Sequence, residues 1–136
     1  MHAFDSSVPL PQLTDEEEAY FSASEEQELW RRLRCKRWVD LANPDVFEAT
    51  SPDVLAWGAY LPISWYMYFL PAFLIVADEG KSSYFENFRG VLCRYLELTP
   101  ATVSIQRDQL VFDALHLELS NDQWTVIRQF LIKYPA

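Results

Sequence analysis

Residues 54–77 read VLAWGAYLPISWYMYFLPAFLIVA, a run of 24 residues without a charged side chain. A run of this length is long enough to cross a bilayer. Two prolines interrupt it, however, and several tyrosines fall at what would be mid-depth, whereas tyrosine in membranes prefers the interface. The residues that flank the run are acidic, not basic. We therefore predict a buried core element here and no membrane span.

Two helices are predicted within this run. Ser51-Pro52-Asp53 is typical of a helix start, because proline fits the first turn, and it predicts a helix over 54–60. Pro62 begins a second helix that runs to about residue 76. Pro71 lies inside this second helix and is expected to kink it, because proline lacks the N–H that the helix ladder uses.

Upstream of the run, two more helices are predicted by the residues at their ends. Thr14 and Glu17 form a capping box, in which each side chain satisfies a backbone N–H of the first turn. Ser24 can cap a second helix whose early residues are acidic and whose last residues are basic, a polarity that suits the helix dipole. Glu28 and Arg32 are four residues apart in this helix and can pair.

Downstream of the run, two segments have clear helical signals. Apolar residues recur at helical spacing through 84–96. Ser120 and Gln123 form a second capping box, and Leu119 and Trp124 occupy the staple positions around it. This pattern predicts that the last helix begins directly after Ser120.

The remaining segments complete a mainly α-helical prediction. Residues 45–50 allow about one helical turn. Residues 101–117 fit either a short helix or a short pair of strands, so both stay open. Residues 1–13 contain two prolines and are expected to form a flexible N-terminal arm. We predict an all-α fold of five or six helices with at most one short strand pair, in a single domain over 14–136.

The net charge of the chain is −9, which limits its partners. An acidic domain is repelled by nucleic-acid phosphates and anionic lipids, so we expect neither nucleic acid nor a membrane as partner. The basic residues nevertheless cluster over 31–37, between Trp30 and Trp38. Basic residues beside aromatic ones are typical of nucleic-acid sites, but cations are equally typical of a helix C-terminus. We interpret the cluster as a helix end, with contact to a protein, an anionic ligand or nucleic acid as alternatives.

Catalytic and metal-binding patterns are not evident in the sequence. His2 and His116 are isolated, and neither Cys35 nor Cys93 has zinc-ligand spacing, so we expect no metal and no cofactor. Two reduced thiols without a visible secretory signal predict a cytoplasmic protein. The acidic clusters are expected to be solvated, whereas acid–base catalysis needs desolvated carboxylates. A hydrolase that uses Cys93 or His116 is kept as one alternative to a non-enzymatic protein.

Three motifs occur in an order that resembles a known family. They are Trp38-Val-Asp-Leu41, Tyr68-Phe-Leu-Pro-Ala-Phe-Leu74 and Leu119-Ser-Asn-Asp-Gln123 followed by Phe130-Leu131. Together they resemble a family of small bacterial proteins known only as a domain of unknown function. The resemblance covers residues 14–133. It implies a soluble helical domain of bacterial origin and brings no catalytic residues with it.

The leading functional hypothesis is a non-enzymatic protein-binding domain. An acidic domain without catalytic geometry can cover a basic effector by charge complementarity, as an immunity or antitoxin-like factor does. Aromatic residues are also abundant over 57–73, and aromatic side chains are typical of interaction surfaces, so a homo-oligomeric module that uses this segment is the second alternative. The expected partner-binding residues are Asp15, Glu16, Glu17, Glu18, Glu25, Glu26, Glu28, Trp57 and Tyr60.

Overall fold

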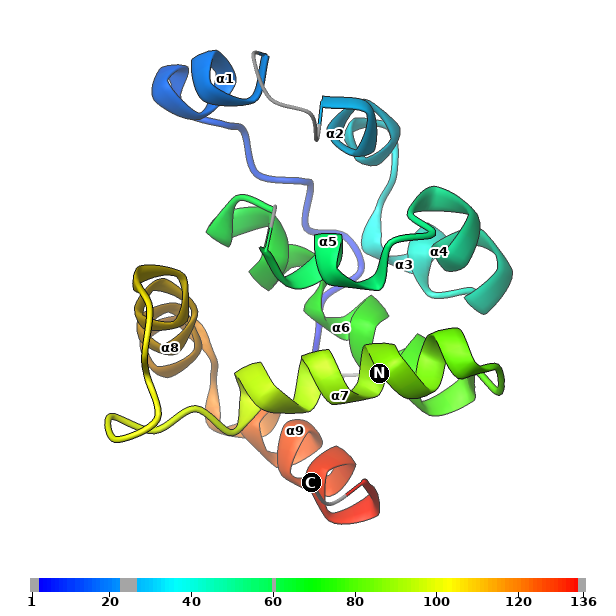
Figure 1. The fold of residues 1–136 in the computed structure, drawn as a ribbon, viewed down its shortest axis with the longest axis vertical. Coiled ribbons are helices and arrows are strands. Elements are labelled where there is room, and N and C mark those ends of the chain that lie inside the picture. Colours follow the sequence, from blue (N-terminus) through cyan, green and yellow to red (C-terminus); the bar gives the residue numbers. More distant parts are fainter. Residues whose placement is uncertain (1–2, 23–26, 60, 135–136) are drawn as a thin grey trace.

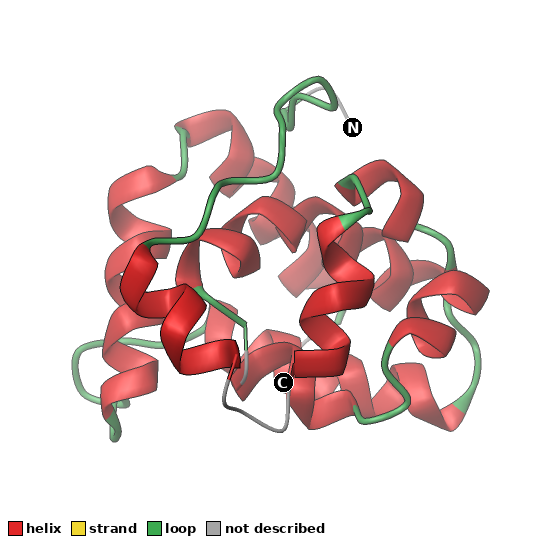
Figure 2. Cartoon of the chain, turned by 90° about the horizontal axis from the view of Figure 1, so that it is seen from above, coloured by secondary structure: helices red, strands yellow, loops and turns green. Residues whose placement is uncertain are grey.

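The computed structural model describes residues 3–22, 27–59 and 61–134, which form nine helices and no strand (Figure 1). In chain order they are α1 (Asp15–Ser22), α2 (Gln27–Arg34), α3 (Trp38–Leu41), α4 (Pro44–Thr50), α5 (Val54–Ala59), α6 (Ile63–Glu79), α7 (Ser83–Leu96), α8 (Gln106–Glu118) and α9 (Asn121–Lys133). Figure 2 shows these helices joined only by loops. The predicted all-α class is confirmed for the described residues.

The predicted number of five or six helices was too low, and the strand pair is not observed in the described ranges. Helix α5 corresponds to the helix predicted over 54–60, and α4 to the turn predicted over 45–50. Helix α3 was not predicted, because its four residues are too few for a periodic pattern to be recognised. The ambiguous stretch belongs largely to α8, which buries Val111, Ala114 and Leu115 at helical spacing. Leu117, the last residue of that stretch, is 84% exposed.

Helix α6 is the central element of the fold. It buries eleven of its seventeen residues and contacts α3, α4, α7, α8 and α9. The helix continues through Pro71, which is itself buried. The run over 54–77 is therefore a core element, as predicted, divided between α5 and α6. Among the described residues, no helix combines the length and the apolar character that crossing a membrane requires.

Aromatic rings fill the centre of the core. Phe47 of α4 stacks on Trp57 of α5, with their centroids 4.1 Å apart. Its ring also meets Phe88 of α7 at 4.8 Å and Phe73 of α6 at 5.9 Å. Rings in such edge-on and stacked contacts contribute beyond the area that they bury, so Phe47 joins four helices into one core.

The backbone of α5 is in close contact with side chains of α7 and α8. A Cβ added at Gly58 would lie 2.7 Å from Cε2 of the buried Tyr95 ring, so this approach requires glycine. Arg107 of α8 donates from Nε to the Gly58 carbonyl (2.9 Å) and from Nη1 to the Leu61 carbonyl (2.7 Å). These bonds attach the start of α8 to the end of α5 and the loop after it.

The loop between α7 and α8 is fixed by a buried carboxylate. Asp108 is fully buried and accepts two hydrogen bonds from Arg94, at 3.0 and 2.9 Å. The backbone N–H and the hydroxyl of Ser104 also donate to it, at 3.2 and 3.1 Å. The Arg94 guanidinium is the main cause that lowers the pKa of Asp108 below its ordinary value.

Both predicted capping boxes are confirmed. Thr14 N–H donates to Glu17 Oε1 (2.9 Å), and Glu17 N–H donates to Thr14 Oγ1 (3.1 Å). At the start of α9, the same exchange joins Ser120 and Gln123, at 2.9 and 3.1 Å. The predicted start of the second helix at Ser24 lies outside the described residues.

Residues 3–13 form no helix and lie along the helical body. In Figure 1 the blue trace runs from α1 past the centre of the molecule. Phe4 is only 8% exposed and belongs to the core. The absence of helix in 3–13 agrees with the prediction from Pro9 and Pro11, and the expected flexibility of the segment stays a prediction.

Candidate protein-binding surface

The acidic residues of α1 divide into two groups. Asp15 and Glu16 are exposed, and neither is in an ion pair within the described part of the chain. Glu17 is used by the capping box of α1. Glu18 Oε2 accepts a hydrogen bond from Arg34 Nη2 of α2 at 2.6 Å. The predicted cluster is thus partly engaged within the molecule, and its first two residues face solvent.

The other predicted acidic residues lie on or before α2. Glu28 pairs with Arg32 at 3.3 Å, as predicted, and with Arg31 at 3.7 Å. All three side chains are largely exposed, so these pairs add little to stability. Glu25 and Glu26 lie outside the described residues.

A hollow of about 480 Å³ lies where the N-terminal segment, α1, α2 and α6 meet. It is lined by Leu10, Pro11, Gln12, Leu13, Asp15, Glu18, Arg34 and Trp65. Two predicted site residues, Asp15 and Glu18, therefore both line it. We name this feature the α1 hollow. Arg34 and Trp65 were not predicted as part of it, because only the tertiary structure brings α2 and α6 to α1.

The basic cluster forms the end of α2, in line with its interpretation as a helix end. Arg31, Arg32 and Arg34 occupy the last turn. Arg32 Nη1 also donates to the Thr50 carbonyl at the end of α4, at 3.1 Å. The arginines at the end of α2 therefore attach this helix to α4 and, through Arg34 and Glu18, to α1.

The prediction that Trp57 contributes to an interaction surface is wrong. Its side chain is 0% exposed, and its indole Nε1 donates to the Tyr84 hydroxyl at 2.9 Å. Helices α4, α5, α6 and α7 converge around Trp57, and large rings fill the space between them. The other described aromatic residues of this segment, also buried, are Trp65, Tyr66, Tyr68, Phe69 and Phe73. Tyr60 lies outside the described residues.

Cys93 and His116 have separate surroundings. The Cys93 Sγ lies 3.9 Å from the Tyr134 carbonyl, and burial, with Glu97 as a further cause, raises the pKa of the Cys93 thiol. A raised pKa disfavours the thiolate that a nucleophile needs. His116 is exposed, and its Nδ1 lies 2.9 Å from the Phe112 carbonyl.

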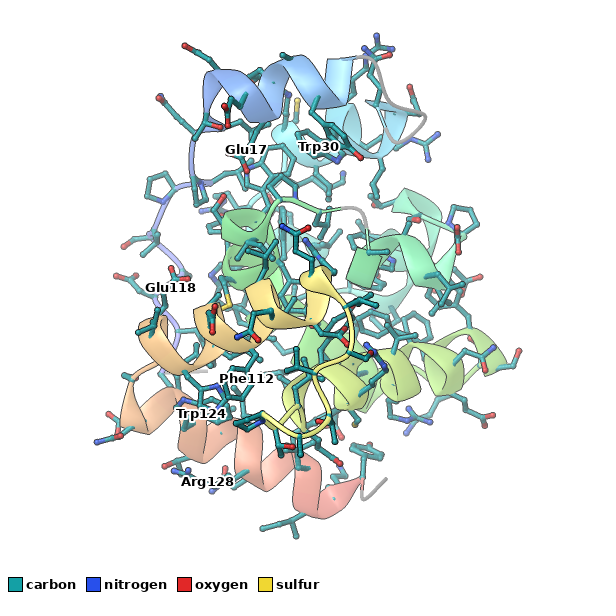
Figure 3. The ribbon with its side chains drawn as sticks, turned by 60° about the vertical axis from the view of Figure 1, so that its left-hand side comes forward. Glu17, Trp30, Phe112, Glu118, Trp124 and Arg128 are labelled. Carbon is teal, nitrogen blue, oxygen red and sulfur yellow. The ribbon has the colours of Figure 1, made fainter. Side chains whose placement is uncertain are left out.

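The His116 ring is occupied by aromatic stacking. It stacks on Phe112 with centroids 4.2 Å apart and meets Trp124 at 5.1 Å. Phe112 and Trp124 lie where α8 and α9 face each other (Figure 3). His116 thus joins two helices. Among the described residues, three or more side chains of the metal-ligating kinds do not gather at any one place.

Comparison with family models, with curated proteins and with solved structures gave no match. The resemblance to a family of bacterial proteins therefore stays a prediction. The functional argument rests on the geometry and the charge of the described surface.

Proposed function

We propose that this chain is a non-enzymatic protein-binding domain whose partner presents a basic side chain or segment to the α1 hollow. The observation that carries the proposal is the gathering of Asp15 and Glu18 at one open hollow, with Glu16 exposed beside them. An open concave site whose lining includes both apolar side chains and carboxylates fits the stem and the charged end of lysine or arginine.

Electrostatics favours a basic partner. The chain carries a net charge of −9, and a field of this sign accelerates association with a positively charged partner. Four acidic residues occupy the first turn of α1. Their charge outweighs the positive end of the helix dipole, which amounts to about half a unit charge. Arg34 offsets one of these charges through Glu18.

The specific form of the proposal is an immunity or antitoxin-like role in which the domain neutralises a basic effector. A bacterial origin and a cytoplasmic location belong to the same proposal. Cys35 and Cys93 are free thiols, which fits a reducing compartment.

The test is affinity capture with tagged protein at low and at high salt, with two matched double variants. Asp15→Asn with Glu16→Gln removes two charges beside the α1 hollow. Glu86→Gln with Asp122→Asn removes two first-turn charges from α7 and α9, and so controls for net charge and for helix-dipole effects. We expect the wild type to capture a basic partner at low salt and to lose it at high salt. At low salt, Asp15→Asn with Glu16→Gln should fail to capture this partner, whereas Glu86→Gln with Asp122→Asn should still capture it.

The opposite pattern would contradict the proposal. A partner captured equally by the wild type and by Asp15→Asn with Glu16→Gln would place its binding elsewhere. Equal loss with both double variants would reduce the role of the α1 hollow to a general effect of charge.

A further inference from the structure

Three side chains from three helices hold the backbone of the N-terminal segment. All three donate hydrogen bonds to carbonyl groups of residues 3–11. The pairs are Trp38 Nε1 with the Asp5 carbonyl (3.3 Å), Trp65 Nε1 with the Pro11 carbonyl (2.8 Å) and Gln123 Nε2 with the Ala3 carbonyl (3.2 Å). The donors come from α3, α6 and α9, so a segment without helix is bound across the helical body.

This mode of binding recognises an extended backbone. Every residue has a backbone carbonyl group, so these hydrogen bonds depend on the backbone conformation of the segment and not on the identity of its side chains. Residues 9–11 read Pro-Leu-Pro, and prolines at this spacing favour the polyproline II conformation. Grooves lined by aromatic side chains are the usual recognition sites for such segments. Trp65, which binds the Pro11 carbonyl, is only 2% exposed and is therefore held rigidly.

An aromatic anchor lies at the other end of the segment. Phe4 is 8% exposed and packs with the core. A second hollow, of about 140 Å³, lies beside it, and its lining includes Phe4, Trp38, Met67, Tyr68, Pro71 and Gln123. Pro71 has no N–H, so the Met67 carbonyl lacks its usual donor in the helix. This part of the surface thus combines an apolar site with polar backbone recognition.

The segment does not fill the surface on which it lies. The side chains of residues 5–9 are exposed, so the middle of the segment is attached mainly through its backbone. Space remains at both ends, in the hollow of about 140 Å³ beside Phe4 and in the α1 hollow of about 480 Å³ beside Pro11. A different segment with the same backbone conformation and larger side chains would make additional contacts.

We propose that this surface, named here the arm groove (Trp38, Trp65, Tyr68, Pro71 and Gln123), docks an extended segment of a partner protein. The segment that fits has an aromatic residue followed, five residues later, by Pro-x-Pro, which is the chemistry of Phe4 and residues 9–11. The chain's own segment is the resident competitor that such a partner displaces. The proposal stands without the basic partner proposed above, because it requires no charge at Asp15 or Glu16.

The test measures binding of a labelled peptide with the sequence of residues 3–14 to the full chain by fluorescence anisotropy. The resident segment competes at an effective concentration of about millimolar, so the wild type should bind the peptide weakly. Phe4→Ala in the full chain removes the anchor of the resident segment, whereas the peptide retains its own phenylalanine. We expect the dissociation constant to fall at least ten-fold in this variant. Leu55→Ala, which changes an exposed side chain on α5, should bind as the wild type does.

Peptide variants test the chemistry independently of the folding of the protein. Replacement of the peptide's phenylalanine by alanine should weaken binding to the Phe4→Ala chain at least ten-fold. Replacement of both of its prolines by glycine should also weaken binding. The chain has five tryptophans, whose indole N–H signals can be followed by NMR. Addition of the peptide should move the signals of Trp38 and Trp65.

Three outcomes would overturn the proposal. The first is equal binding of the peptide by the wild type and by Phe4→Ala. The second is tight binding that leaves the Trp38 and Trp65 signals unmoved. The third is concentration-dependent dimerisation of the wild type with movement of those two signals, which would assign the groove to the same segment of a second copy. The double variant Asp15→Asn with Glu16→Gln should leave peptide binding unchanged, so this proposal and the proposed function fail separately.

Discussion

Helices α6 and α1 are held in the molecule in different ways. Eleven of the seventeen residues of α6 are buried, and it packs against α3, α4, α7, α8 and α9. In α1, by contrast, none of the six described side chains is buried, and four of them are acidic. Helix α6 depends on tertiary packing, whereas α1 depends on its capping box, its dipole and the ion pair of Glu18 with Arg34. The helix that has no buried side chain among those described thus carries Asp15 and Glu16, the two exposed residues of the candidate surface.

The largest expected effect comes from opening a cavity in α6. Phe73 is 0% exposed and meets the rings of Phe47 and Trp57. Phe73→Ala should lower the free energy of unfolding by about 3–5 kcal/mol, because it removes buried area and leaves a cavity. Urea unfolding followed by tryptophan fluorescence measures this change. Leu55→Ala, at a position that is 64% exposed, is the control and should change stability by less than about 0.5 kcal/mol. A similar loss in both variants would contradict the central role of α6.

An intermediate effect is expected from the buried carboxylate of α8. Asp108→Asn should lower the free energy of unfolding by about 2–3 kcal/mol at neutral pH. This loss is smaller than that expected from breaking a fully buried ion pair, because Arg94 is 49% exposed. Since the pKa of Asp108 is lowered in the folded state, its stabilisation is present above the ordinary value of 3.8 and is lost as the pH falls through the lowered pKa.

The pH dependence separates this charge effect from a loss of packing. Unfolding curves of the wild type and of Asp108→Asn should converge as the pH is lowered below about 4. Urea midpoints measured between neutral and acidic pH test this expectation. A difference between the two proteins that stays constant over that range would show that the charge of Asp108 does not stabilise the fold.

The smallest effects sharpen the comparison between packed and unpacked helices. Thr14→Ala and Ser120→Ala remove the same kind of N-cap hydrogen bond from α1 and α9. Each substitution should destabilise its helix by about 1 kcal/mol. In α9, which buries Ile127 and Phe130, the loss should lower the urea midpoint of the whole protein. In α1 the loss should appear only as faster amide hydrogen exchange in that helix. An equal decrease of the urea midpoint in both variants would mean that α1 unfolds together with the core.

Local signals in the sequence were sufficient for much of the fold. Both capping boxes, the pair of Glu28 with Arg32 and the core position of 54–77 were predicted and are confirmed. All of these depend on residues that are close in the chain or on a long uncharged run. Helix α5 was predicted from its Ser-Pro-Asp start, and α4 was predicted as about one helical turn. The four-residue α3 was not recognised, because so short a segment contains too little of the helical period.

The candidate surface was predictable only in part. The acidic character of α1 follows from its sequence, but the pairing of Glu18 with Arg34 does not, because the two residues belong to different helices. Trp57 was assigned to the surface because an aromatic residue suits a core and an interface equally well. Only the convergence of α4, α5, α6 and α7 on one point decides between them.

The sequence by itself determined the helical class, the capped helix ends and the acidic character of the chain, because these follow from short-range periodicity, local hydrogen bonding and composition. Only the tertiary structure decided which aromatic residues are buried and where the N-terminal segment lies. The bond from Gln123 to the Ala3 carbonyl joins residues 120 positions apart. Contacts of this kind depend on how the helices pack as a whole, and no local pattern encodes them.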